Sequence, residues 1–385
     1  MSTASAPDST LRVRKVEIRV YRAPIQTSVT TSFGTMHDRP AVLVCLEDAD
    51  GTRGWGEIWC NFPQCGAEHR AALLQSVFAP LLMNRQFQNP DTLTRELTRR
   101  THTLMLQTAE YGPMQQCLAG VNNAAWDLAA RREGVPLYRL LGGTECASVP
   151  AYASGINPLQ CLETVESCRK TGFRTFKLKV GFDRKADQDN VRRITDGLLP
   201  HEQLLLDANQ AWDLDTAVTV LRELAAWNPG WIEEPLRCDR PLEEWRSLAQ
   251  LSPIPLAAGE NLRSQEAFRA APKYLAYVQP DACKWGGVSG CLIAARTALH
   301  AGAVYCPHYL GGGIGLLTSA HLLAAAGGTG MLEVDVNPNP LRDGLVHPRP
   351  QLRDGRFLLP EGPGIGVEPD HGAVADFLQR TYVCG

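Results

Sequence analysis

The stretches LLLDAN (204–209), WIEEP (231–235) and PLAAGE (255–260) each carry a run of apolar residues into a carboxylate. The three acids, Asp207, Glu233 and Glu260, are 26 and 27 residues apart, about one strand–helix–strand repeat. In a closed α/β barrel such strands are neighbours, and their acids meet at one rim. Convergent carboxylates repel one another unless a cation lies between them, and oxygen ligands without Cys or His favour Mg²⁺ over Zn²⁺. The spacing therefore predicts a magnesium site.

The bulk composition is that of an ordinary globular protein. The chain has 385 residues, 44% of them hydrophobic and 21% charged, with a net charge of −3. This charge offers no broad basic footprint for nucleic acid and no polybasic membrane anchor. The first residues lack an apolar core, no apolar run is long enough to span a bilayer, and the twelve cysteines are scattered. We expect a cytoplasmic protein with reduced thiols and neither nucleic-acid nor membrane partners.

Residues 1–140 predict an α+β domain, of which residues 1–10 are expected to be a disordered tail. Two polar loops are expected, from Thr27 to Arg39 and from Trp59 to Gly66. From Glu68 to about Glu133 the pattern is helical. The strand patterns that precede the helical part are VRKVEIRVY (13–21), AVLVCLED (41–48) and TRGWGEI (52–58).

After Leu140, eight short β-type runs recur at intervals of 22 to 29 residues and alternate with amphipathic helical stretches. Eight parallel strands close a barrel of the TIM type. An open doubly wound sheet is the alternative, but it would need a glycine-rich phosphate turn, and ASGINP (153–158) is not one. We expect the barrel over residues 141–345 and a Pro- and Gly-rich segment, residues 346–385, that packs back on the first domain. The runs are VPAYA (149), TFKLKV (175), LLLDAN (204), WIEE (231), PLAAGE (255), YVQPDA (277), AVYCPH (303) and MLEVD (331).

Almost every predicted barrel strand ends in an ionisable residue, which is where barrel enzymes place their active sites. Lys177 and Lys179 share one face of the second strand, and proximity of two ammonium groups lowers a lysine pKa, as a base requires. Asp281 and His308 end adjacent strands and form an acid–imidazole pair suited to general-base catalysis. Lys284 lies off the rim by strand parity.

The motifs in this order resemble the enolase superfamily, specifically the mandelate racemase branch of its mandelate racemase and muconate lactonizing enzyme family. The resemblance covers essentially the whole chain. It implies a modified TIM (β/α)7β barrel with an N-terminal α+β capping domain, a Mg²⁺ cofactor, a small-molecule carboxylate substrate and a homo-oligomer. The matching motifs are KLK (177–179), LDAN (206–209), IEEP (232–235), AGE (258–260), QPDACKWGG (279–287), CPH (306–308) and LEVD (332–335).

The resemblance assigns Asp207, Glu233 and Glu260 as the Mg²⁺ ligands. It favours Glu233 over Glu234 because the first acid of the pair is the ligand. Strand alternation agrees, since Glu234 would point into the barrel wall.

The resemblance also implies a role for five further residues. Lys179 and His308 are the bases on opposite sides of the substrate, with Asp281 as the partner of His308. Lys177 is an electrostatic partner of the substrate carboxylate. Glu333 is a donor to the second carboxylate oxygen, which requires it to be protonated. The supporting or substrate-binding candidates are Asn209, Lys284, Trp59 and Asn61.

The glycine-rich stretch YLGGGIG (309–315) and the polar cap loops without a dense aromatic lining suit a sugar acid. We therefore expect proton abstraction α to a carboxylate with ene-diolate stabilisation, in an acid-sugar dehydratase that forms a 2-keto-3-deoxy acid. A lactone cycloisomerase and a racemase or epimerase of a 2-hydroxy acid remain as alternatives. A noncatalytic barrel would lack one of the acids, and a barrel hydrolase would offer several His ligands. The sequence leaves open which acid sugar is used and the number of subunits.

Overall fold

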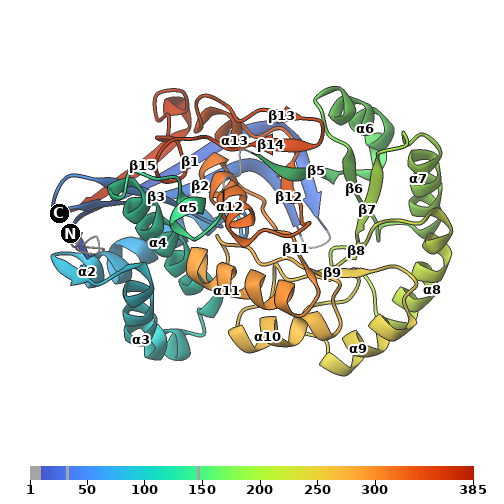
Figure 1. Cartoon of the computed structure of the whole chain (residues 1–385), viewed down its shortest axis with the longest axis horizontal. Helices are drawn as coiled ribbons and strands as arrows, with labels where there is room; N and C mark the ends of the chain where they lie inside the picture. The colour runs from blue at the N-terminus through green and yellow to red at the C-terminus, as the bar shows by residue number, and fades with distance from the viewer. Residues whose placement is uncertain (1–9, 32–33, 145–147) are drawn as a thin grey trace, which may run out of the picture.

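The computed structural model describes residues 10–31, 34–144 and 148–385, which form a capping domain beside a barrel (Figure 1). The fold class predicted from the sequence is confirmed. The predicted disordered tail, residues 1–10, lies outside the described residues apart from Thr10.

Long antiparallel strands form the sheet of the cap, in the order β15-β1-β2-β3, with β4 paired to β1. Helix α4 lies against this sheet, and α3 packs beside α4 (Figure 1). The strands are β1 (Leu11–Thr31), β2 (Gly34–Asp48), β3 (Arg53–Ile58) and β4 (Arg85–Phe87). The helices are α1 (Gly66–Leu73), α2 (Ala79–Leu82), α3 (Pro90–Thr108), α4 (Tyr111–Arg132) and α5 (Leu137–Leu140), with a π-helical turn at Leu74–Phe78.

The prediction of a loop from Thr27 to Arg39 is wrong. Strands β1 and β2 continue through most of it as a hairpin, in which Val29 is paired with Met36 and Thr30 with Thr35. Valine and threonine are β-branched and favour strands, so this stretch can form a strand even though its polarity resembles that of a loop.

Eight strands, β5 to β12, form the barrel. The order β11-β10-β9-β8-β7-β6-β5 is parallel throughout, and β12 pairs in parallel with β5. Between β11 and β12, the N–H of Met331 donates to Sγ of Cys306 over 3.3 Å. The strands are β5 (Ser148–Ile156), β6 (Thr175–Lys179), β7 (Gln203–Asp207), β8 (Ile232–Glu233), β9 (Leu256–Ala258), β10 (Tyr277–Val278), β11 (Val304–Tyr305) and β12 (Leu332–Asp335).

A helix follows each of the first seven strands, whereas β12 is followed only by the short helix α13 (Pro340–Gly344), so the barrel has the (β/α)7β form. Helix α8 illustrates how the sequence sets these helices. The side chain of Asp213 caps the N–H of Thr216, and Ala217, Val220, Leu221 and Leu224 recur at helical spacing on the buried face. The seven helices are α6 (Cys161–Lys170), α7 (Arg184–Asp196), α8 (Leu214–Leu224), α9 (Leu242–Leu251), α10 (Gln265–Ala270), α11 (Gly287–His300) and α12 (Gly313–Ala326).

The C-terminal segment contacts both domains. Strand β14 (Arg356–Leu358) pairs with β13 (Leu352–Arg353) and with β5 of the barrel, whereas β15 (Leu378–Cys384) pairs with β1 of the cap. The segment therefore lies along the barrel before it reaches the cap sheet.

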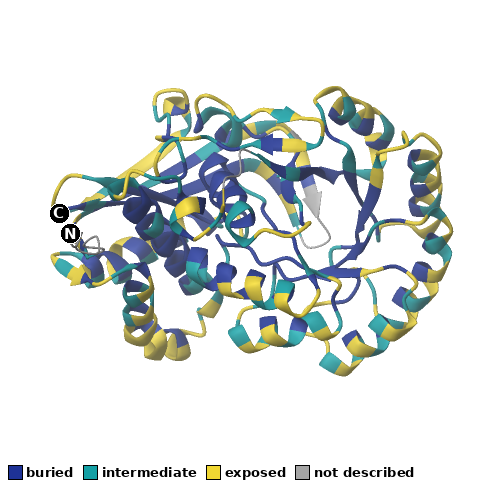
Figure 2. Cartoon of the chain, in the orientation of Figure 1, coloured by how far each residue is buried: buried dark blue, intermediate teal, exposed yellow. Residues whose placement is uncertain are grey.

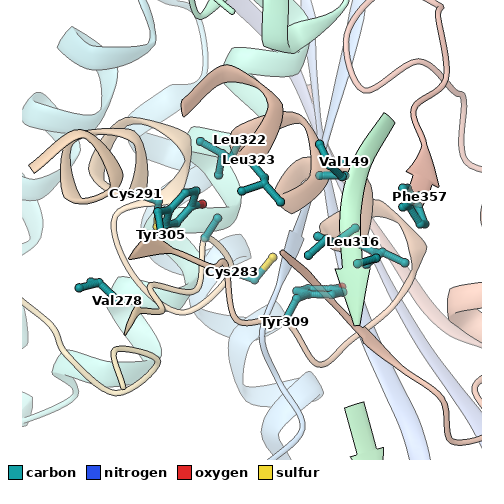
Figure 3. Packing of buried hydrophobic residues seen from close by; sticks show 14 of the residues in the cluster. Val149, Val278, Cys283, Cys291, Tyr305, Tyr309, Leu316, Leu322, Leu323 and Phe357 are labelled. Atoms are coloured by element: carbon teal, nitrogen blue, oxygen red, sulfur yellow. The ribbon is translucent and has the colours of Figure 1, made fainter. Parts of the chain in front are cut away.

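Burial follows this architecture: the barrel strands and the inner faces of the helices are buried, and the outer helix faces are exposed (Figure 2). The barrel core continues into the cap through Tyr21 and Trp55, so the two domains share one apolar cluster. Figure 3 shows part of it, with Tyr305 beside Cys291 and with Tyr309 near Leu316. Every helix within the described ranges is too short or too polar to cross a membrane.

Candidate active site

The ladder of the barrel brings the predicted acids to one rim. Lys179 on β6 pairs with Asp207 on β7, which in turn pairs with Glu233 on β8. Glu260 follows β9 after Gly259, whose φ is +149°. A Cβ at Gly259 would lie 2.6 Å from the backbone nitrogen of Gln279, so only glycine fits where the chain turns toward the rim.

Each of the three predicted metal ligands is buried and turned toward a cation. Nζ of Lys177 lies 2.7 Å from Oε2 of Glu233, and Nζ of Lys179 lies 3.2 Å from Oδ2 of Asp207. Oε2 of Glu260 contacts Nε2 of His308. The carboxylates are thus held by ammonium and imidazolium groups from other strand ends of the same rim.

The donor set fits Mg²⁺ by its chemistry, because buried carboxylate oxygens on three adjacent strands are the ligands that this ion prefers. Burial together with repulsion from Asp207 and Glu333 raises the pKa of Glu233 to about 7, although Lys177 opposes this change. In the described parts of the chain, no three acidic, His or Cys side chains already surround one ion-sized point. Binding the ion would require the carboxylates to turn from their present cations toward a common centre.

The predicted acid–imidazole pair is formed. Nδ1 of His308 lies 2.8 Å from Oδ2 of Asp281, while Oδ1 of Asp281 accepts from the N–H of Cys283 over 2.7 Å. With Asp281 as acceptor, Nδ1 carries the proton and Nε2 faces the rim. Burial alone would lower the pKa of His308, but the carboxylates of Glu260 and Glu333 outweigh it and raise this pKa well above its ordinary value.

Neighbouring charges act against two of the predicted protonation effects. Burial would raise the pKa of Glu333, but Lys177 and His308 outweigh it and lower this pKa to about 2, which disfavours the protonated form that the donor role requires. Burial would lower the pKa of Lys177, but Glu233 and Glu333 raise it well above its ordinary value. The expected lowering by a second ammonium group fails because Lys177 lies between carboxylates, 2.7 Å from each of those two.

One predicted orientation is also wrong. Lys284 lies at the rim, with Nζ 3.3 Å from Oε2 of Glu260 and 4.9 Å from the ring centre of Trp59. Glu234 is buried away from the active-site cavity, beside Trp245 of α9, and its φ of +39° follows the end of β8 at Glu233. Its carboxylate accepts from Nδ2 of Asn261, which also donates to Glu260. Strand alternation does not extend past the last strand residue.

One cavity of about 50 Å³ connects the rim to the cap. It brings together Lys179, Asn209, Lys284 and His308 with two of the acids. Two aromatic residues of the cap, Trp59 and Phe62, line the cavity. The other apolar groups in the lining are Val29 of the cap and Leu310 of the barrel.

Asn61, the remaining candidate from the cap, is buried and donates through Nδ2 to the carbonyl of Leu310 over 2.8 Å. It therefore supports the segment after His308. Lys177 and Glu233 lie beneath the cavity rather than in its lining, as the ion pair that they form is fully enclosed.

Several residues of the site escape the sequence argument. Ser154 lies near the end of the first barrel strand and donates to Oε1 of Glu333 over 2.5 Å, and the same strand-end rule would have found it. Asn337 lines the cavity two residues beyond β12 and contacts Asp335. Gln279 donates to Oε2 of Glu233 over 2.7 Å. Neutral amides carry no spacing signal, so only the fold identifies these two.

Two family models match the chain. One, described as the mandelate racemase / muconate lactonizing enzyme N-terminal domain, matches residues 11–142, and the other, an enolase C-terminal domain-like model, matches residues 160–373. A solved mandelate racemase/muconate lactonizing enzyme from Bordetella bronchiseptica RB50 is 48% identical, with a TM-score of 0.90 over 95% of this chain and 99% of that one.

Two further relatives have described activities. A D-galactarolactone cycloisomerase from Agrobacterium fabrum is 26% identical over 95% of this chain and 99% of its own length. The structure of an L-talarate dehydratase from Polaromonas sp. JS666, complexed with Mg and L-glucarate, is 27% identical, with a TM-score of 0.83 over 98% of this chain and 100% of that one. Other relatives are dehydratases, racemases and synthases.

Proposed function

Because the chain belongs to the mandelate racemase and muconate lactonizing enzyme family of the enolase superfamily, we propose that it is an acid-sugar dehydratase. Magnesium is the cofactor of this family, and Asp207, Glu233 and Glu260 hold it in the proposed enzyme. The observation that carries the proposal is that Lys179 and His308 line the same cavity. Asp207 and Glu260 line it with them.

Lys179 and His308 come from the second and seventh barrel strands, so they approach a bound carboxylate from different sides. Lys179 takes the proton α to the substrate carboxylate. When bound, Mg²⁺ supplies Lewis-acid stabilisation of the ene-diolate. Asp281 accepts the Nδ1 proton of His308, so the protonated ring donates through Nε2–H to the departing β-hydroxyl and water leaves. The resulting enol tautomerises to a 2-keto-3-deoxy acid.

Lys177 and Glu333 act around this chemistry. Glu333 is an acceptor for Nζ of Lys177 and for the backbone N–H of Tyr309, at 2.7 and 3.1 Å. The pair fixes the rim, and Lys177 contributes a buried ammonium group beneath the cavity. Ser154, Asn209 and Asn337 offer hydrogen bonds for hydroxyl groups of a sugar acid.

The apolar groups of the cap close over the cavity. Its volume of about 50 Å³ is below the roughly 300–1,000 Å³ of small-molecule pockets. Trp59 and Phe62 therefore have to move outward to admit a substrate, and their return excludes water from the ene-diolate.

The test is a set of acid sugars incubated with the protein and Mg²⁺: galactarate, L-glucarate, arabinonate and D-galactarolactone. We expect loss of one water and a 2-keto product from one of the acids, together with deuterium at the α-carbon of recovered substrate in D₂O. Lys179→Met should abolish both, whereas His308→Asn should abolish the elimination. No reaction on any of these substrates, or full activity of both variants, would contradict the proposal.

The second candidate is a sugar-lactone cycloisomerase. The Agrobacterium relative, which matches almost end to end, favours it. Proton abstraction by Lys179 is the same, but the ring oxygen of the lactone leaves instead of a hydroxyl. Conversion of D-galactarolactone without change of mass, and no water loss from the open acids, would select this reaction over dehydration.

A further inference from the structure

Glu57, on strand β3 of the cap, binds the start of a barrel helix. It is 2% exposed, and its two oxygens accept from the N–H of Gly312 over 2.5 Å and of Gly315 over 2.9 Å. These amides belong to the first turn of α12, whose capping residue Gly312 has no side chain to offer. A carboxylate at this end also interacts favourably with the positive end of the helix dipole. The side chain that caps the N-terminus of this barrel helix therefore comes from the capping domain.

The segment between His308 and α12 is only four residues long, and hydrogen bonds hold most of it. The N–H of Tyr309 donates to Oε2 of Glu333, and its hydroxyl donates to the carbonyl of Gly312 over 2.7 Å. Asn61 of the cap donates to the carbonyl of Leu310. Movement of the helix start is thereby transmitted to the backbone of His308.

The glycines of this segment leave room for Glu57. A Cβ at Gly312 would lie 2.8 Å from Oε1 of Glu57, and one at Gly315 would lie 2.4 Å from the hydroxyl of Tyr309. Any side chain at Gly312 would displace the carboxylate from the amide that it binds.

From this geometry we propose that Glu57 is a positioning residue, through which the cap sets the place of His308 over the substrate. The inference rests on the function proposed above, in which His308 donates the proton to the leaving group. Lys179 stands on β6 and is hydrogen-bonded to Asp207 and Asn209 of the next strand end, away from the segment that Glu57 holds. Loss of Glu57 should therefore affect proton donation by His308 and spare proton abstraction by Lys179.

The experiment compares two rates in D₂O with Mg²⁺ and whichever of the four probe substrates the wild-type protein converts. One rate is deuterium uptake at the α-carbon of recovered substrate, and the other is product formation. Glu57→Gln keeps the volume but turns an amide NH₂ toward one backbone N–H. Since misplacement of a catalytic group by about 1 Å costs on the order of 10²-fold, we expect product formation to fall about that much and deuterium uptake to stay within about twofold.

Asp127→Asn is the matched control. Asp127 on α4 is also a fully buried cap carboxylate that accepts two backbone N–H groups, those of Trp55 and Ile365, and it is additionally paired with Arg131 rather than with the His308 segment. This variant should lose thermal stability and keep the wild-type ratio of the two rates. Gly312→Ala tests the same contact with Glu57 intact, and it should reproduce the changed ratio even where Glu57→Gln does not fold.

An unchanged ratio in Gly312→Ala, or an equal fall of both rates in Glu57→Gln, would overturn the inference while leaving the dehydratase proposal intact. A wild-type protein that neither exchanges nor converts any of the four substrates would instead overturn the proposed function, and the inference with it.

Discussion

Nδ1 of His308 lies 2.8 Å from Oδ2 of Asp281, and both side chains are buried. Asp281→Asn should keep the hydrogen bond that the N–H of Cys283 donates to Oδ1. It should place the new side-chain NH₂ group against Nδ1 of the imidazole. The ring would then present the wrong tautomer to the substrate. We expect kcat for elimination to fall on the order of 10²-fold or more, as for loss of general acid–base catalysis. Steady-state kinetics measure this, and a kcat close to that of the wild type would refute the role of the pair.

The two adjacent acids Glu233 and Glu234 give the second prediction. Glu233→Gln should weaken Mg²⁺ binding by more than the roughly 10–100-fold that loss of a supporting residue costs, because it removes a charged ligand. Glu234→Gln should have the smaller effect, since Glu234 contacts Asn261 and Gln210 instead. Isothermal titration with MgCl₂ compares the two variants. Equal loss of affinity in both variants would contradict the assignment of Glu233 alone as the ligand. A larger loss in Glu234→Gln would identify Glu234 as the ligand instead.

The third prediction concerns the ion pair of Arg39 on β2 with Asp335 at the end of β12, which joins cap and barrel with 2.7 Å between Nη2 and Oδ2. Both side chains are buried, so Arg39→Met should leave an unpaired charge and lower the free energy of unfolding by about 3–5 kcal/mol. The exposed helical pair of Arg100 with Glu96 is the control, and Arg100→Met should change stability by less than about 1 kcal/mol. Urea unfolding followed by tryptophan fluorescence measures both, and similar losses would contradict the interpretation.

The fourth prediction is a pH dependence of stability. His321 on α12 is fully buried, and this burial lowers its pKa to about 4. A pKa lower in the folded than in the unfolded chain, where it is about 6.5, means that unfolding takes up a proton. The contribution is fully present above about pH 6.5 and is lost as the pH falls through 4.

Between pH 7.5 and pH 4 the wild type should therefore lose about 3 kcal/mol more stability than His321→Gln. Urea unfolding at both values measures the difference. His300→Gln, which removes an exposed histidine at the end of α11, should retain the wild-type pH dependence. Parallel curves for the wild type and His321→Gln would show that His321 does not titrate between these values.

Sequence reasoning succeeds where a repeat determines position. Parallel neighbouring strands with equal spacing put Asp207 beside Glu233 whatever the helices between them are, and the acid–imidazole pair follows by the same rule. The family, the fold class and the magnesium cofactor predicted from these motifs are confirmed. The catalytic roles stay predictions until the variants are measured.

The errors arise where long-range contacts decide the outcome. The charge of Glu333 depends on Lys177, which is 156 positions away in the sequence but in contact in the barrel. No sequence pattern predicts this contact. Lys284 reaches the rim after β10 has ended. Glu57 lies in a cap strand that looks purely structural, because its partners are backbone amides and leave no signature.

Strand β15 pairs with β1, and this pairing affects the order of folding. The pair Val16 and Cys384 is separated by 384 − 16 = 368 positions. The barrel strands from β5 to β11 each pair with the next strand along the chain, and the closing pair of β12 with β5 spans 332 − 151 = 181 positions. Closing such a span is entropically unfavourable, and non-local pairings form slowly. We expect the βα units to assemble first and the cap sheet to be completed last. A refolding chain would thus pass through a state in which the acidic rim is formed but still open to solvent.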